Sequence, residues 1–233
     1  MDFSDFSKLM FSTQNAVLPS PTGMRVALHV FWALALGCAT LLIARKLSRD
    51  YRLGLTIAVM SWTLLPGAAS PAYWLGLAFQ TPSLTSAVIC LAWLVSRRPW
   101  TQGEGILGSS GGPIDVSALW ALAGMALGWV LLLDALAWLP VSVYAWGFSS
   151  AAFAAVALLL TLIWVVGGRV NGLRDASLMA CVLGLFVLTR LPTGNVWDAL
   201  IDPWLWVGLQ ACWLFSVVRR LRHAWRGQAT TRA

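Results

Sequence analysis

The sequence predicts an all-α fold: a polytopic integral membrane protein with about seven transmembrane helices and one short interfacial or re-entrant helix. Of the 233 residues, 59% are hydrophobic and only 11% are charged, and the mean hydropathy is +0.75. In soluble domains about a quarter of the residues are charged. Because the polar connections between the apolar runs are too short to form a core of their own, no separate soluble domain is expected.

The distribution of positive charge predicts the orientation. When the apolar runs are treated as spans, Lys8, Arg25 and Arg190 fall on one side of the membrane. The other thirteen of the sixteen cations fall on the opposite side: Arg45, Lys46, Arg49, Arg52, Arg97, Arg98, Arg169, Arg174, Arg219, Arg220, Arg222, Arg226 and Arg232. Short cytoplasmic loops collect Lys and Arg. The N-terminus is therefore predicted outside and the C-terminus in the cytoplasm, in a bacterial inner membrane.

The charges and apolar runs together divide the chain into three parts. These are an extracytoplasmic segment (1–23), a helical bundle (24–218) and a basic cytoplasmic tail (219–233). Seven spans are expected at about 24–44, 53–68, 82–96, 115–139, 147–166, 173–191 and 203–218. Neither a positive n-region nor a small-residue cleavage site precedes the first span, which favours a retained helix over a secretory signal.

Prolines mark the end of the second span. Pro66 removes a backbone donor, so this span is expected to end near Leu65. Ser70 is a good N-cap and Pro71 suits the first helical position, so a short helix is expected from Ser70 to Gln80. That helix is too short to cross about 30 Å of hydrocarbon, and it is expected to lie in the interface or to enter the membrane and return.

Similar start signals open two later spans. Thr81-Pro82 is expected to begin the third span, and Asp202-Pro203 is expected to cap the seventh. Between the third and fourth spans, the Gly- and Ser-rich segment Pro99–Pro113 is expected to be a flexible loop.

Three polar residues at similar depth form the candidate functional cluster. Asp134 interrupts an otherwise apolar run, where a charged side chain is costly, about 2.5–3.5 kcal/mol at the bilayer centre. His29 and Arg190 fall near the same face when the spans are threaded. An Asp134–Arg190 pair with His29 nearby would satisfy buried charge, bind an anion or relay protons. The alternatives are a structural bond for Asp134, a bond between helices for His29 and extension to the interface for Arg190.

Small residues predict where helices approach closely. Gly124 and Gly128 form a GxxxG pair in the fourth span, and Ala33 and Gly37 form a similar pair in the first. Such pairs allow close backbone contact, which drives helix association in lipid. Packing within the chain is the first interpretation, and a homo-oligomer or a partner subunit is the second.

Aromatic side chains concentrate at the expected outer ends of the spans. They are typical of an interfacial belt, and a contact surface for a partner or a flat ligand is the alternative. The residues are Trp138, Tyr144, Trp146, Trp197, Trp204 and Trp206.

Several kinds of site are not supported by the sequence. Gly103–Gly108 matches GxGxxG, but neither a strand nor a βαβ unit surrounds it. The four cysteines lack metal-ligand spacing, so no metal site is assigned, and His29 and His223 do not supply two membrane haem ligands. The net charge of +7 is explained by orientation and anionic lipid, so nucleic-acid binding is not expected.

These observations favour a non-catalytic accessory or assembly subunit of a membrane complex. No catalytic residue set is identified and no cofactor is assigned, so an enzyme is less favoured. The first alternative is a small transporter or channel that uses Asp134, Arg190 and His29, and the second is a membrane enzyme acting on lipid-like substrates. The expected partners are the lipid bilayer and either another membrane protein or a second copy of the chain.

Overall fold

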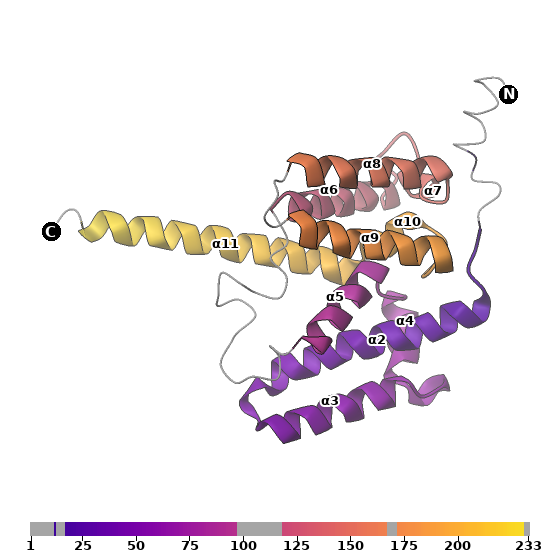
Figure 1. Cartoon of the computed structure of the whole chain (residues 1–233), viewed down its shortest axis with the longest axis horizontal. Helices are drawn as coiled ribbons and strands as arrows, with labels where there is room; N and C mark the ends of the chain where they lie inside the picture. Colours follow the sequence, from indigo (N-terminus) through magenta and orange to yellow (C-terminus); the bar gives the residue numbers. More distant parts are fainter. Residues whose placement is uncertain (1–11, 13–16, 97–117, 167–171, 231–233) are drawn as a thin grey trace.

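The computed structural model describes residues 12, 17–96, 118–166 and 172–230, and within these ranges the chain is all helical and contains no strand (Figure 1). The expected all-α fold is therefore confirmed for this part of the chain. The α-helices are α2 (Pro21–Ile43), α3 (Arg49–Thr63), α4 (Pro71–Phe79), α5 (Leu84–Val95), α6 (Ala118–Ala135), α7 (Val143–Trp146), α8 (Ser150–Val166), α9 (Gly172–Thr189), α10 (Val196–Leu200) and α11 (Pro203–Thr230). Two 3-10 turns, η1 (Ala44–Lys46) and η2 (Gly67–Ala69), flank α3.

Helix α5 joins two groups of helices. On one side α2 packs against α3, α4 and α5; on the other, α9 contacts α8 and α5, and α11 contacts α6 (Figure 1). The short helix α10 touches both α5 and α9. The two groups are thus connected through α5 and α10, near the end of the bundle where α9 ends and α11 begins.

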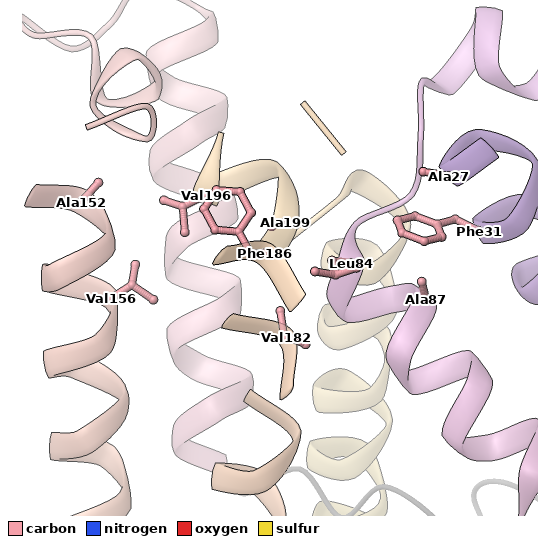
Figure 2. Packing of buried hydrophobic residues seen from close by; sticks show 10 residues of the cluster. All are labelled: Ala27, Phe31, Leu84, Ala87, Ala152, Val156, Val182, Phe186, Val196 and Ala199. Atoms are coloured by element: carbon pink, nitrogen blue, oxygen red, sulfur yellow. The ribbon is translucent and has the colours of Figure 1, made fainter. Parts of the chain in front are cut away.

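The buried apolar core lies along this connection. Phe186 and Val182, one helical turn apart on α9, are almost completely buried, and side chains from four other helices surround them (Figure 2). The full cluster comprises Ala27, Phe31, Leu84, Ala87, Ala152, Val156, Val182, Phe186, Val196 and Ala199. Every helix that meets at α5 and α9 contributes to it, so the core holds both groups together.

The described helices overlap the seven ranges expected to be spans, with bounds that differ by several residues, and most of the helices are short. Among the described residues, one helix, Pro21–Lys46, is long and apolar enough to cross a membrane. Four shorter apolar helices have 10–17 residues: Leu84–Val95, Trp120–Ala135, Ser150–Leu162 and Ser177–Thr189. At 1.5 Å per residue, 10–17 residues reach about 15–26 Å, compared with about 30 Å of hydrocarbon. The seven-span arrangement therefore stays a prediction.

Two of the expected helix starts are confirmed and one is wrong. Ser70 caps α4, with its hydroxyl accepting from the Ala72 N–H at 3.1 Å and Pro71 in the first position. Asp202 caps α11, with Oδ1 accepting from the Leu205 N–H at 2.8 Å. Helix α5, however, does not begin at Thr81-Pro82. Its N-cap is Ser83, because this hydroxyl accepts from the Ser86 N–H at 3.0 Å.

Some expectations fall outside the described residues. They include most of the N-terminal segment 1–23, the loop Pro99–Pro113 and, within it, the GxGxxG match Gly103–Gly108. At the other end of the chain, α11 continues through the start of the basic tail to Thr230.

Candidate functional site

Asp134 lies in the last turn of α6, and its carboxylate is hydrogen-bonded to the start of α7. Its Oδ2 accepts a hydrogen bond of 2.6 Å from the backbone N–H of Tyr144. Tyr144 is the second residue of α7, and a carboxylate is favourable at a helix N-terminus, where free N–H groups point outward. Asp134 therefore acts as a cap for a neighbouring helix in the α6–α8 connection.

The Tyr144 side chain extends this hydrogen-bond network to α10. Its hydroxyl donates to Asp198 Oδ2 at 2.8 Å, and the Thr193 hydroxyl donates to the same oxygen. Partial burial, together with this bond to Asp198, raises the pKa of Tyr144 above its ordinary value. The phenol is thus held in its protonated, donating form.

Asn195 is the fully buried centre of this network. Its Nδ2 donates to the Tyr144 carbonyl at 2.9 Å, and its Oδ1 accepts from the Trp197 N–H at 2.9 Å. Two further bonds join the same segments: Trp197 Nε1 donates to the Val143 carbonyl, and the Val196 N–H donates to the Gly147 carbonyl. The α9–α10 loop is therefore fixed to α7 by several directional contacts.

Asp202 forms a second polar centre, at the junction of α5 and α11. This carboxylate is 7% exposed. Its Oδ2 accepts from the Ser83 N–H at 2.8 Å and from the Ser86 hydroxyl, while Oδ1 caps α11. Nearby, the Thr85 hydroxyl donates to the Ala199 carbonyl at 3.1 Å. One carboxylate thus receives donors from the first turns of two helices, which satisfies the buried charge.

The structure does not join Asp134, Arg190 and His29 into one bonded cluster. Within the described residues, Asp134 and Arg190 form no ion pair, so the expected pair is not found. The Arg190 guanidinium lies over the Phe186 ring, 5.4 Å from its centroid, after the chain leaves α9 in a left-handed conformation (φ 57°). His29 Nδ1 donates to the Arg25 carbonyl of its own helix at 2.9 Å. The physical reason is local: the Asp134 carboxylate accepts from the backbone N–H of Tyr144 in the adjacent connection, so it does not depend on a distant cation.

The small residues expected at helix contacts lie inside the bundle. A Cβ added to Gly128 would lie 2.2 Å from Trp206 Cδ1, and one added to Gly124 would lie 2.9 Å from Leu209 Cδ1, so both glycines face α11. A Cβ at Gly37 would lie 2.8 Å from Met60 Sδ of α3, and Ala33 is 2% exposed. These positions bring α6 close to α11 and α2 close to α3.

Two features limit the chemistry of this region. Among the described residues, no group of three or more His, Cys, Asp or Glu side chains is placed to hold a metal ion. The carboxylates of Asp134, Asp198 and Asp202 all accept hydrogen bonds from the protein itself. These hydrogen bonds join the start of α7 to that of α10 and the start of α5 to that of α11.

The chain matches no protein-family model, no curated protein and no solved structure.

The sequence reasoning missed Tyr144, Asn195 and Asp198 as members of the polar network. Tyr144 was assigned only to the aromatic belt. The available signal was the segment Thr193-Gly194-Asn195 followed by Asp198, in which Asn195 is a good N-cap and Asp198 falls in the first turn of α10. That pattern predicts a short helix, but it does not indicate which residues the side chains contact.

Replacing Tyr144 with phenylalanine tests the link to α10. Loss of one hydrogen bond to a carboxylate at a partly exposed site is expected to lower the free energy of unfolding by about 1 kcal/mol. Because folding raises the Tyr144 pKa, its contribution is complete below about pH 10 and is lost as the pH rises further. Thermal unfolding in mild detergent should show a smaller alkaline loss of stability for Tyr144→Phe than for the wild type. Equal alkaline losses of stability in the two proteins would contradict the hydrogen bond from Tyr144 to Asp198.

Proposed function

We propose that the protein is a multi-pass inner-membrane protein that serves as a non-catalytic accessory or assembly subunit of a membrane complex. The observation that carries this proposal is the apolar surface on the outside of the bundle. Large apolar side chains are more than 60% exposed on five helices and on the turn that follows α6. They include Leu77 (α4), Val95 (α5), Leu158 (α8), Leu188 (α9), Phe215 (α11) and, in the turn, Trp138. Large apolar side chains exposed on so many elements are unfavourable in water and favourable against lipid or a partner's helices.

Exposed tryptophans support placement at a membrane surface. Trp74, Trp146 and Trp204 are about half exposed and belong to α4, α7 and the first turn of α11. These elements lie at the same end of the bundle (Figure 1). Amphipathic indole rings favour the headgroup level, which agrees with the outer side expected from the charge distribution.

The hydrogen-bonded state of the acidic residues supports the non-catalytic part of the proposal. An acid that relays protons or binds a substrate needs a carboxylate oxygen that the proton or the substrate can reach. The carboxylates of Asp134, Asp198 and Asp202 instead accept hydrogen bonds from backbone and hydroxyl groups of the chain. One observation favours a small transporter or channel instead: Nε2 of His29 is buried and has no hydrogen-bond partner among the described residues. A single imidazole nitrogen is a weaker basis than the apolar surface.

The test of this proposal has two parts, and the first is topology. Reporter fusions after Arg52 and Ala233 are expected to report the cytoplasm, and fusions after Pro82 and Thr193 the opposite side, because of the charge distribution. Recovery of the untagged chain in the soluble fraction, or an external signal at Ala233, would contradict the expected threading.

The second part is the mass of the purified assembly. Native mass spectrometry in mild detergent should detect the 25.3 kDa chain in a fixed stoichiometry with a different protein. A single chain or a homo-oligomer would exclude the subunit proposal.

Asp134→Asn then separates the alternatives: a variant that folds normally but loses the cellular phenotype indicates transport, whereas reduced abundance indicates a structural carboxylate.

A further inference from the structure

Arg52 is a buried arginine, and two of its three guanidinium nitrogens lack a partner among the residues that the structure describes. It is 4% exposed, and its Nε and Nη2 are enclosed and have no hydrogen-bond partner within the described residues. A buried charge without a counter-charge is strongly unfavourable. A long side chain at a membrane surface usually extends its charged end into water, and Arg52 does not.

Four aspartates have described side chains, and none of them pairs with Arg52. Asp134, Asp198 and Asp202 are bonded to other groups at the α7, α10 and α11 helix starts. Asp50 is exposed and lies two residues before Arg52 in α3. Side chains two residues apart on a helix point to different faces. The guanidinium therefore has unused donors in an enclosed position.

The start of α3 offers further donors close to Arg52 along the chain. Side chains of helical residues generally point toward the helix N-terminus, so we expect Arg52 to lean toward the turn that begins at Ser48. Ser48 holds the N-cap position but makes no side-chain cap hydrogen bond. The free N–H groups of this turn carry partial positive charge. Arg52 shares its buried face with Thr56 and Thr63, which places this face against α2, the main packing partner of α3.

Three more cations lie beside this turn. Arg45 and Lys46 form the 3-10 turn η1 between α2 and α3, and Arg49 is the first residue of α3; all three are exposed. An anion at the start of α3 would thus meet a buried fork of N–H donors, free backbone N–H groups and a cationic rim. Arginine forks match phosphate oxygens in geometry as well as charge, and helix N-termini bind phosphate for the same electrostatic reason.

We propose that Arg52 and the first turn of α3 form a binding site for a phosphate-type oxyanion, with Arg45, Lys46 and Arg49 as its rim. In the membrane orientation proposed above, on which the lipid form of this inference rests, the site lies at the cytoplasmic headgroup level. The phosphate of an anionic phospholipid and free inorganic phosphate share the required chemistry. The two sources are separated by experiment.

The experiment uses the full-length chain and two probes. In dodecyl maltoside, inorganic phosphate at constant ionic strength is expected to raise the thermal unfolding temperature of the wild type. In nanodiscs, replacing part of the phosphatidylcholine with phosphatidylglycerol is expected to raise it as well. Arg52→Met should be more stable than the wild type without either probe, because it removes an unpaired buried charge, and its phosphate affinity should fall at least about tenfold. Arg25→Gln, an exposed cation in the first turns of α2 and outside the proposed site, is the matched control and should retain the full response.

Each outcome supports or overturns the site. A response to both probes through Arg52 indicates a lipid headgroup site, and a response to inorganic phosphate alone indicates a soluble ligand. Phosphorus analysis of the purified chains detects retained phospholipid: phosphorus present in the wild type and lost in Arg52→Met also supports the site. No response together with no retained phosphorus, or equal responses of the wild type and Arg52→Met, overturns it. The detergent assay does not require a partner subunit, so its failure is distinguishable from failure of the proposed function.

Discussion

Replacing Asp202 with alanine is expected to lower the free energy of unfolding by about 3–5 kcal/mol. The carboxylate accepts from the Ser83 N–H, the Ser86 hydroxyl and the Leu205 N–H, and it is 7% exposed. Hydrogen bonds to a charged group contribute about 1.5–3 kcal/mol each, and donors left unpaired in a buried site add a desolvation cost. Alanine removes all three bonds at once, so both helix starts are affected.

Denaturant unfolding in mild detergent, read by circular dichroism, measures this loss. Asp202→Asn should be intermediate, because an amide has one acceptor oxygen and its NH₂ group would face donors. The matched control is Asp50→Asn, an exposed acid in the first turn of α3, where the loss should be about 0.3–1 kcal/mol. If Asp202→Ala is no more destabilising than Asp50→Asn, the carboxylate does not join α5 to α11.

Gly147→Ala is expected to lower the free energy of unfolding by about 3 kcal/mol. An added Cβ would lie 1.8 Å from Asn195 Oδ1 and 2.4 Å from Trp197 Cδ1. Both side chains are fixed by hydrogen bonds to α7, so neither can move without losing one. The Gly147 backbone (φ −59°, ψ −15°) is one that alanine readily adopts, so the clash alone produces the effect. Overpacking typically costs about 1–3 kcal/mol, and loss of a buried hydrogen bond adds to it.

Two other glycines provide matched controls for Gly147→Ala. Gly184 in α9 and Gly208 in α11 have open space where a Cβ would lie. Alanine at either helical position should stabilise the protein by about 0.5–1 kcal/mol, because it restricts the unfolded chain. The thermal unfolding temperature should therefore fall in Gly147→Ala and rise in Gly184→Ala and Gly208→Ala. An unchanged unfolding temperature in Gly147→Ala would show that the α7–α10 contact is not tight.

The helices could be predicted from the sequence because their signals are local. Apolar runs, Ser70 with Pro71, and Asp202 with Pro203 each act within a few residues, and the structure has helices at these places. Ser83 was missed because Thr81-Pro82 gives a similar local signal two residues earlier. The number of membrane crossings depends on helix length and tilt against a bilayer, which composition alone does not determine.

The polar contacts could not be predicted from the sequence because they join residues distant along the chain. The bond from Tyr144 to Asp198 spans 54 residues, and the bond from Asn195 to Tyr144 spans 51. Similar depth in the membrane predicts a pair between Asp134 and Arg190, but equal depth does not specify which helices are neighbours. The sequence places Arg52 among the cytoplasmic cations but does not predict its burial, because burial of one basic residue among several depends on how α3 packs against α2.

The bond between Ser83 and Asp202 also sets an order of events during synthesis, because it spans 119 residues. Ribosomes extend the chain at about 5–20 residues per second. The first turn of α5 therefore exists for about 6–24 s before the carboxylate that completes it has been made. Throughout that interval the group formed by α2, α3, α4 and α5 has an open polar end. Arrival of α11 closes this end, so a nascent chain stopped before residue 202 lacks the acceptor for the Ser83 N–H and the Ser86 hydroxyl.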